Sequence, residues 1–134
     1  MSDAVIPPRV QRFISTHIDS IEKLEVLLLL RARAEREWGA RDVSQELRIT
    51  EASAAARLED LTARRLLAVR EGTPPSYRFS PASSEDAQDV SALQETYSTR
   101  RVSVISFIFS KPLDKVRGFA DAFRLKRDKD EGHG

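Results

Sequence analysis

The chain has 134 residues, of which 40% are hydrophobic and 32% charged, and its formal net charge at pH 7 is +1. This length allows one domain with a substantial core, and the absence of cysteine excludes disulfides and cysteine-ligated metal sites. A charge so close to neutral excludes a basic nucleic-acid-binding tail, so any DNA contacts depend on a few well-placed arginines. The N-terminus lacks the features of a signal peptide, and no apolar run approaches the roughly 20 residues that span a bilayer. These features predict a cytoplasmic protein without a membrane segment.

Residues 1–18 are predicted to form an N-terminal arm followed by a short helix. The Pro7–Pro8 pair opposes helix formation in the arm. From Arg9 to Thr16, helical spacing is shown by the apolar residues Val10, Phe13 and Ile14.

The second predicted helix begins at Asp19-Ser20-Ile21-Glu22, which has the pattern of a capping box. Its apolar face includes Ile21, Leu24, Leu27 and Leu28. The helix is expected to end at Gly39, because glycine favours helix termination. Trp38, beside that glycine, is interpreted as a packing anchor rather than a platform for a ligand.

Two further helices are expected around a tight turn. A short helix covers residues 40–47, and Arg48-Ile49 forms the turn. Thr50 is a good N-cap for the next helix, and Glu51 suits the positive end of its dipole. This helix is expected to continue to about Arg65.

A two-stranded wing follows these helices. The alternation from Leu66 to Glu71 predicts one strand, and a second strand covers Tyr77–Ser80 after the turn GTPPS. The expected register pairs Val69 with Phe79 and places Arg70 opposite Arg78 on the outer face. Two opposed arginines favour a nearby anion such as phosphate, although two solvated arginines that splay apart are an equally simple interpretation.

The order helix, helix, tight turn, helix and two-stranded wing resembles the winged helix-turn-helix of bacterial transcriptional regulators, with the MarR-like group as the nearest type. The resemblance covers residues 19–80 and rests on the pattern of elements in RDVSQELRITEASAAARLEDLTARRLLAVREGTPPSYRFS. It implies a regulator of transcription whose 51–65 helix enters the major groove of duplex DNA. Winged helices also serve as protein–protein interaction modules, which is the alternative function.

The expected recognition helix has two contrasting faces. At about 100° per residue, one side carries Ala54, Leu58, Leu61 and Arg65. The opposite side carries Ala52, Ala56, Glu59 and Ala63. Small side chains on the outer face allow the helix backbone to approach the floor of a DNA groove, but they provide few base-specific hydrogen bonds.

The candidate DNA-binding residues follow from this placement. Ser53 and Arg57 are the best candidates for base reading, because they flank the exposed alanines near the start of the helix. Arginines around the helix are expected to contact phosphate, which positions the protein without reading sequence. The full candidate set is Arg41, Arg48, Thr50, Ser53, Ala56, Arg57, Arg70 and Arg78. The alternative is an ordinary solvated surface in which the alanines simply favour helix.

Residues 81–125 are predicted to form a C-terminal helical region that makes a homodimer. A helix begins after Ser83 or Ser84, and its helical stripe consists of Val90, Leu93, Tyr97, Val104 and Ile108. Unbroken to Ser110, this helix would be about 40 Å long. The segment 102–110 is compatible with helix or strand. Pro112 starts a last helix with Leu113, Val116, Phe119, Ala120 and Phe123, and residues 126–134 are a disordered tail.

Two alternatives to the dimer remain open. The C-terminal region can instead fold back on Phe13, Leu24 and Leu28 and complete a monomeric core. A small-molecule pocket lined by Tyr97, Phe107, Phe109 and Phe119 is the other, although the sequence points to no particular effector.

The sequence does not favour an enzyme. His17 and His133 are the only histidines and lack metal-ligand spacing, and no glycine-rich phosphate loop is present. No cofactor or metal is therefore predicted. The sequence predicts a mainly α-helical winged helix-turn-helix protein that binds double-stranded DNA as a homodimer.

Overall fold

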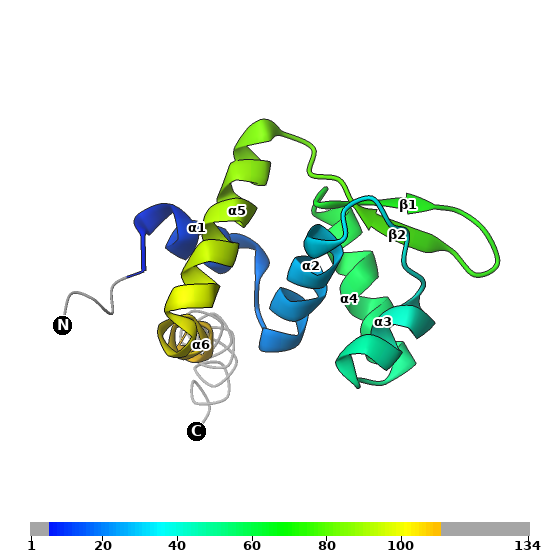
Figure 1. Cartoon of the computed structure of the whole chain (residues 1–134), viewed down its shortest axis with the longest axis horizontal. Helices are drawn as coiled ribbons and strands as arrows, with labels where there is room; N and C mark the ends of the chain where they lie inside the picture. Colours follow the sequence, from blue (N-terminus) through cyan, green and yellow to red (C-terminus); the bar gives the residue numbers. More distant parts are fainter. Residues whose placement is uncertain (1–5, 111–134) are drawn as a thin grey trace, which may run out of the picture.

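The computed structural model describes residues 6–110, which form six helices and one two-stranded sheet (Figure 1). In chain order the elements are α1 (Pro8–His17), α2 (Ile21–Ala32), α3 (Ala40–Leu47), α4 (Glu51–Ala63), β1 (Leu67–Arg70), β2 (Ser76–Phe79), α5 (Ser84–Thr99) and α6 (Arg101–Ser110). The predicted mainly helical winged helix-turn-helix is confirmed. Residues 1–5 of the arm, the predicted helix after Pro112 and the predicted tail lie outside the described residues.

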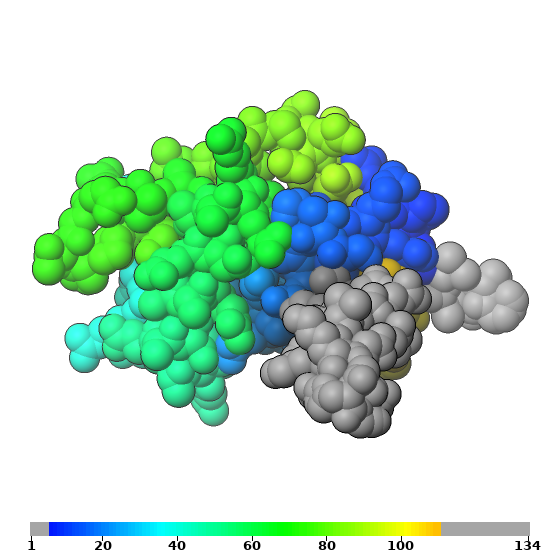
Figure 2. All heavy atoms as spheres, turned by 180° about the vertical axis from the view of Figure 1, so that it is seen from behind, coloured from blue at the N-terminus to red at the C-terminus, as the bar shows by residue number. Residues whose placement is uncertain are grey.

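The elements form two groups that share one core. Helices α2, α3 and α4 pack together with the β1–β2 hairpin, while α1 packs against α5 and α6 (Figure 1). Seen from behind, the hairpin lies at one end of the molecule and the N-terminal segment lies towards the other (Figure 2). One cluster of buried side chains includes residues of both groups, among them Ile14, Leu27, Leu58 and Leu93.

The ends of α2 differ from the prediction. Ser20, not Asp19, is the N-cap: its hydroxyl accepts a hydrogen bond from the Lys23 backbone N–H at 3.1 Å. The helix ends at Ala32, well before Gly39. The chain has to leave the helix early because Trp38 reaches the wing, where its backbone N–H and C=O both bond to Tyr77 at 2.7 Å. Trp38 is 2% exposed, which confirms that it is a packing anchor.

The predicted register of the wing is wrong by two residues. Phe79 pairs with Leu67 instead of Val69, Arg70 lies opposite Ser76, and Arg78 lies opposite Ala68. A slip of two residues keeps every side chain on its own face, so the alternation of the sequence does not distinguish the two registers. The contact between Tyr77 and Trp38 fixes β2 in place, and the opposed arginine pair does not exist.

The C-terminal helix is broken in the structure. Ser83 caps α5 by accepting a hydrogen bond from the Asp86 N–H at 3.0 Å, as one of the two predicted caps. The segment 102–110 is helical, which decides between helix and strand, but Arg100 (φ −133°, ψ 52°) interrupts the expected continuous helix. The break turns α6 away from the line of α5, so that Figure 1 shows α6 nearly end-on.

The predicted apolar stripe of this region lies within the chain's own core. Val90, Leu93, Tyr97, Val104 and Ile108 are each at most 8% exposed. Because α5 and α6 pack on α1, this burial corresponds to the fold-back alternative for the described part of the region. Two large apolar side chains of α6 remain outside, Val102 at 76% and Phe109 at 68% exposure.

Candidate nucleic-acid interface

A tight turn presents α4 at an angle to α3. Arg48 ends α3 in the left-handed conformation, with φ 60°, and the N–H of Ile49 bonds to the Ser44 carbonyl at 3.2 Å. The Ser44 hydroxyl donates to the Ile49 carbonyl at 2.6 Å and closes the turn from the other side. Thr50 then caps α4, because its side-chain oxygen accepts from the Ser53 N–H at 3.0 Å. The predicted turn and the predicted cap are both confirmed.

The two faces predicted for α4 are present. Ala54, Leu58 and Leu61 are fully buried. The outer face is exposed and consists of Ala52, Ala56, Glu59 and Ala63. Arg65 does not continue the buried stripe: it lies beyond the helix end with φ 66° and is exposed. The helix ends two residues earlier than predicted, because the chain must turn there to enter β1.

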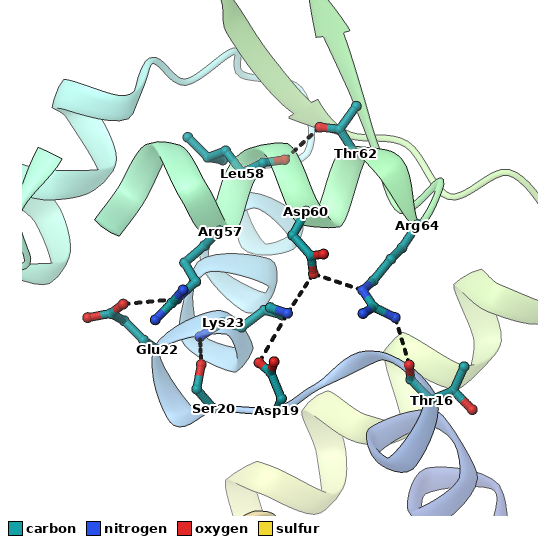
Figure 3. Close-up of polar contacts among 10 residues, drawn as sticks. All are labelled: Thr16, Asp19, Ser20, Glu22, Lys23, Arg57, Leu58, Asp60, Thr62 and Arg64. Atoms are coloured by element: carbon teal, nitrogen blue, oxygen red, sulfur yellow. Dashed lines mark hydrogen bonds and ion pairs between the residues drawn. The ribbon is translucent and has the colours of Figure 1, made fainter. Parts of the chain in front are cut away.

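Arg57 does not point freely into solvent. Its Nε lies 3.0 Å from Oε1 of Glu22 at the start of α2, and both atoms are shielded from solvent (Figure 3). The two groups form an ion pair, but the N–H is not directed well enough at the carboxylate to make a hydrogen bond. The Arg57 side chain remains 32% exposed. The candidate base reader is therefore held against α2, on the shoulder of α4.

The other candidate arginines fall into two groups. Arg70 is paired: its Nε donates to Oε2 of Glu37 at 3.1 Å, and the side chain is 75% exposed. Arg41 at the start of α3, Arg48 in the turn and Arg78 on β2 are exposed, and no ion pair joins any of the three to another described residue. These three arginines are thus available to an anionic partner without breaking an existing pair.

A cluster of charges fixes the back of α4 to α2 and α1 (Figure 3). Lys23 is only 4% exposed, and its ammonium group contacts the carboxylates of Asp19 at 3.0 Å and Asp60 at 2.5 Å. Arg64 donates to the same oxygen of Asp60 at 2.8 Å and to the Thr16 carbonyl at 2.7 Å. Asp60 therefore connects two cations and joins α4 to α2, while Arg64 joins the end of α4 to the end of α1.

The electrostatics of this cluster favour ionised Asp60. Partial burial raises the pKa of the carboxyl group, but hydrogen bonds and charges from Lys23 and Arg64 outweigh that effect and leave the pKa below its ordinary value. The carboxylate thus stays charged at neutral pH and compensates the buried ammonium group of Lys23.

A groove separates the outer side of α4 from the wing. Its volume is about 710 Å³, and its walls come from the start of α3, from α4 between Glu51 and Glu59, and from the hairpin loop and β2. The apolar lining includes Ala52, Ala55, Pro74, Pro75 and Tyr77, and the charged lining consists of Arg41, Asp42, Glu51 and Glu59. Three of these four charges are acidic, so the groove itself is a poor site for phosphate.

Sequence reasoning placed the candidate arginines but missed their partners. The partners are Glu22 for Arg57 and Glu37 for Arg70, and nothing in the local spacing of the sequence connects these two glutamates to α4 or to the wing. The described residues hold no group of three or more acidic, histidine or cysteine side chains suited to a metal ion. Among the helices of residues 6–110, none is long and apolar enough to cross a membrane.

Comparison with known proteins gives one structural likeness. No protein-family model matches the sequence, and no curated protein sequence matches it. The fold is similar to that of an S. aureus MepR mutant whose structure was solved bound to an oligodeoxyribonucleotide, with a TM-score of 0.52 and 10% sequence identity. The matched region covers 90% of this chain and 88% of the MepR chain.

This likeness confirms the fold that the sequence predicted. MepR is a MarR-family winged-helix regulator, and the likeness shows that this chain has the same winged-helix fold. At 10% identity the two sequences have diverged too far for individual residues to be equated, and fold alone does not determine function.

Proposed function

We propose that the protein is a transcriptional regulator that binds duplex DNA, with the N-terminal end of α4 in the major groove and the wing at the sugar–phosphate backbone. The observation that carries the proposal is the exposed outer face of α4. Ala52 and Ala56 leave this face without a large side chain in the first two turns, so the helix backbone can approach the groove floor closely. The fold likeness to a protein solved with bound DNA supports the same function.

The proposed DNA contacts are of two kinds, base contacts at the start of α4 and phosphate contacts around it. Thr50, Ser53 and the methyl group of Ala56 lie where helix-turn-helix proteins contact base edges. Arg41, Arg48 and Arg78 surround them and supply phosphate contacts, since all three are exposed. Arg57 and Arg70 join the interface when they exchange their glutamate partners for DNA. Residues 19–80 thus form the reading domain, which acts in the cytoplasm on the bacterial chromosome.

Binding should depend steeply on salt, because phosphate contacts dominate it. The logarithm of affinity should fall with the logarithm of salt concentration with a slope of about −0.9 for each phosphate neutralised. Replacing Arg41 and Arg78 together by alanine should weaken binding to all sequences by similar factors and make the slope less steep by about 1.8. Gel shifts on genomic fragments around the protein's own gene, repeated over a salt series, measure both effects.

Two results would contradict the expected role of phosphate contacts. Loss of affinity for only one sequence would show that these two arginines read bases. A salt-independent shift would show that phosphate contacts do not carry the binding.

The proposal includes a homodimer formed by residues 81–125. One reading head with few base-specific side chains has low specificity, and two heads on a two-fold site add their energies. Val102 and Phe109 are exposed apolar side chains on α6. Beside them, a shallow groove of about 480 Å³ between the start of α1 and α6 is lined by Ile6, Gln11, Val102, Ser103, Ser106, Phe107 and Ser110.

Phe109→Asp is expected to convert the dimer into a folded monomer. Phe109 is 68% exposed, so the charge remains in water in the monomer and is buried only in the dimer, where it is strongly disfavoured. Ile108→Asp cannot separate these effects, because Ile108 is 2% exposed and its replacement disrupts the monomer itself. Light scattering at micromolar concentration measures the mass, and circular dichroism checks the fold.

Ser91→Asp is the matched control, since Ser91 is an exposed residue of α5 outside the α6 surface. It should remain dimeric. A wild-type chain that stays monomeric at high concentration would remove the dimer from the proposal.

A second candidate function is a winged-helix module that binds another protein. The observation that favours it is the groove between α4 and the wing, where Asp42, Glu51 and Glu59 surround an apolar lining. Such a groove suits a segment with basic and apolar side chains better than it suits phosphate. Substitution of Ala56, considered in the Discussion, distinguishes the two functions.

A further inference from the structure

Two arginines of the proposed interface are held by glutamates of the same chain. We infer that Glu22 and Glu37 compete with DNA phosphate for Arg57 and Arg70, and that this competition lowers the sequence-independent affinity of the protein for DNA. The inference rests on the proposed function, because it specifies how the charge of that interface is regulated.

Glu37 is built to hold Arg70. Two nitrogens of the guanidinium group, Nε and Nη2, each lie 3.1 Å from Oε2 of Glu37. The other carboxylate oxygen, Oε1, accepts a hydrogen bond from the Ser76 hydroxyl at 3.0 Å. Ser76 is the β2 residue opposite Arg70, so the carboxylate contacts both strands at the loop end of the hairpin. Three donor groups from the wing therefore orient one carboxylate from the α2–α3 connection.

Glu22 holds Arg57 by a single ion-pair contact, without a well-directed hydrogen bond. The facing atoms lie 3.0 Å apart and are shielded from solvent, while the two side chains are 32% and 30% exposed (Figure 3). The accessible part of the guanidinium group can meet an incoming phosphate. The two glutamates thus occupy the arginines on both sides of the exposed α4 face.

The exchange of partners is energetically feasible. The Arg70 side chain is 75% exposed, and ion pairs at the surface contribute little to stability and weaken with salt, so a phosphate can displace Glu37. The Arg57–Glu22 pair is more shielded, so its exchange costs more. Because one ion pair is lost for each one gained, however, Arg57 and Arg70 add less to affinity than Arg41, Arg48 or Arg78. Binding to any DNA sequence is weaker as a result, and its salt dependence is less steep than the number of arginines implies.

Glu37→Gln tests the inference directly. Glutamine retains an oxygen for the Ser76 hydroxyl but removes the charge that holds Arg70. The variant should bind a mixed-sequence duplex about two- to fivefold more tightly, the range that an exposed ion pair spans. Its log–log salt slope should be steeper by about 0.9 when Arg70 gains one phosphate. Fluorescence anisotropy between about 50 and 200 mM salt gives both quantities.

A double-mutant cycle and a charge control separate this mechanism from a general change of charge. In an Arg70→Ala background, Glu37→Gln should give no additional affinity, because the released arginine is absent. Glu46→Gln removes an equal charge from the exposed side of α3 without releasing an arginine, so its effect should be smaller. A second double-mutant cycle, with Glu22→Gln and Arg57→Ala, tests the other pair. Thermal unfolding of these variants checks that α2 remains stable, because Glu22 lies in its first turn.

The possible results separate failure of the competition mechanism from failure of the proposed DNA-binding function. A gain that persists without Arg70, or that Glu46→Gln reproduces, overturns the competition while leaving DNA binding intact. Absence of DNA binding by the wild type and by both released variants overturns the proposed function as well.

Discussion

Ala56→Glu is expected to lower the affinity for duplex DNA by more than about 100-fold while leaving the fold unchanged. Ala56 is exposed in the middle of the outer face of α4, so the new side chain does not disturb the core. In the complex, its carboxylate would lie at the groove floor among phosphates. Like-charge contact of this kind costs several kcal/mol, and about 3 kcal/mol corresponds to 100-fold in affinity.

Ala63→Glu is the matched control for this variant. Ala63 lies on the same exposed face, but at the C-terminal end of α4. Because α4 is proposed to enter the groove with its N-terminal end, the control should lose much less affinity. Gel shifts measure binding and circular dichroism measures folding. Retained DNA binding by a folded Ala56→Glu protein would show that this face does not enter the groove, and would favour the interaction module.

Asp60→Ala is expected to lower the free energy of unfolding by about 2–3 kcal/mol. The substitution leaves the ammonium group of Lys23, whose side chain is 5% exposed, with Asp19 as its remaining partner in the cluster. Breaking a fully buried pair costs about 3–5 kcal/mol. The expected loss is smaller here because the Asp60 side chain is 36% exposed. Urea denaturation followed by circular dichroism measures the change.

A second substitution tests whether the unpaired charge is the cause. In Lys23→Met/Asp60→Ala, an apolar side chain of similar length replaces the ammonium group, so much of the lost stability should return. If the double variant is as unstable as the sum of its single variants, the coupling between the two residues is absent.

The same carboxylate sets part of the response to acid. Because the pKa of Asp60 is lowered in the folded state, its contribution to stability is present above the unfolded-state pKa and is lost as the pH falls through the folded-state value. Asp60→Ala should therefore lack this part of the acid destabilisation.

Local sequence determined the helix-turn-helix unit of this protein. The bounds of α3, the turn at Arg48 and the cap at Thr50 depend on residues within a few positions of one another, so composition and spacing suffice to predict them. The alanine face of α4 follows from helical periodicity in the same way. These features carried the winged-helix prediction, and they also located the exposed residues of the candidate site.

Only the tertiary structure decided where several elements end and how they pair. The early end of α2 and the register of the wing both depend on the contact between Trp38, in the α2–α3 connection, and Tyr77 on β2. The break at Arg100 allows α6 to leave the line of α5, and α6 also packs against α1. In each case, local patterns left two geometries open, and contacts between distant segments selected one.

The distribution of available charge over the candidate interface is also decided only by the tertiary structure. The sequence does not show which of Arg41, Arg57, Arg70 and Arg78 has an acidic partner in the fold. The fold makes them different, because it brings Glu22 to Arg57 and Glu37 to Arg70 while leaving Arg41 and Arg78 without an ion pair to any described residue. Residue type determines how much charge the chain carries. Which charges remain available to a partner depends on distances of a few ångströms, and those exist only after folding.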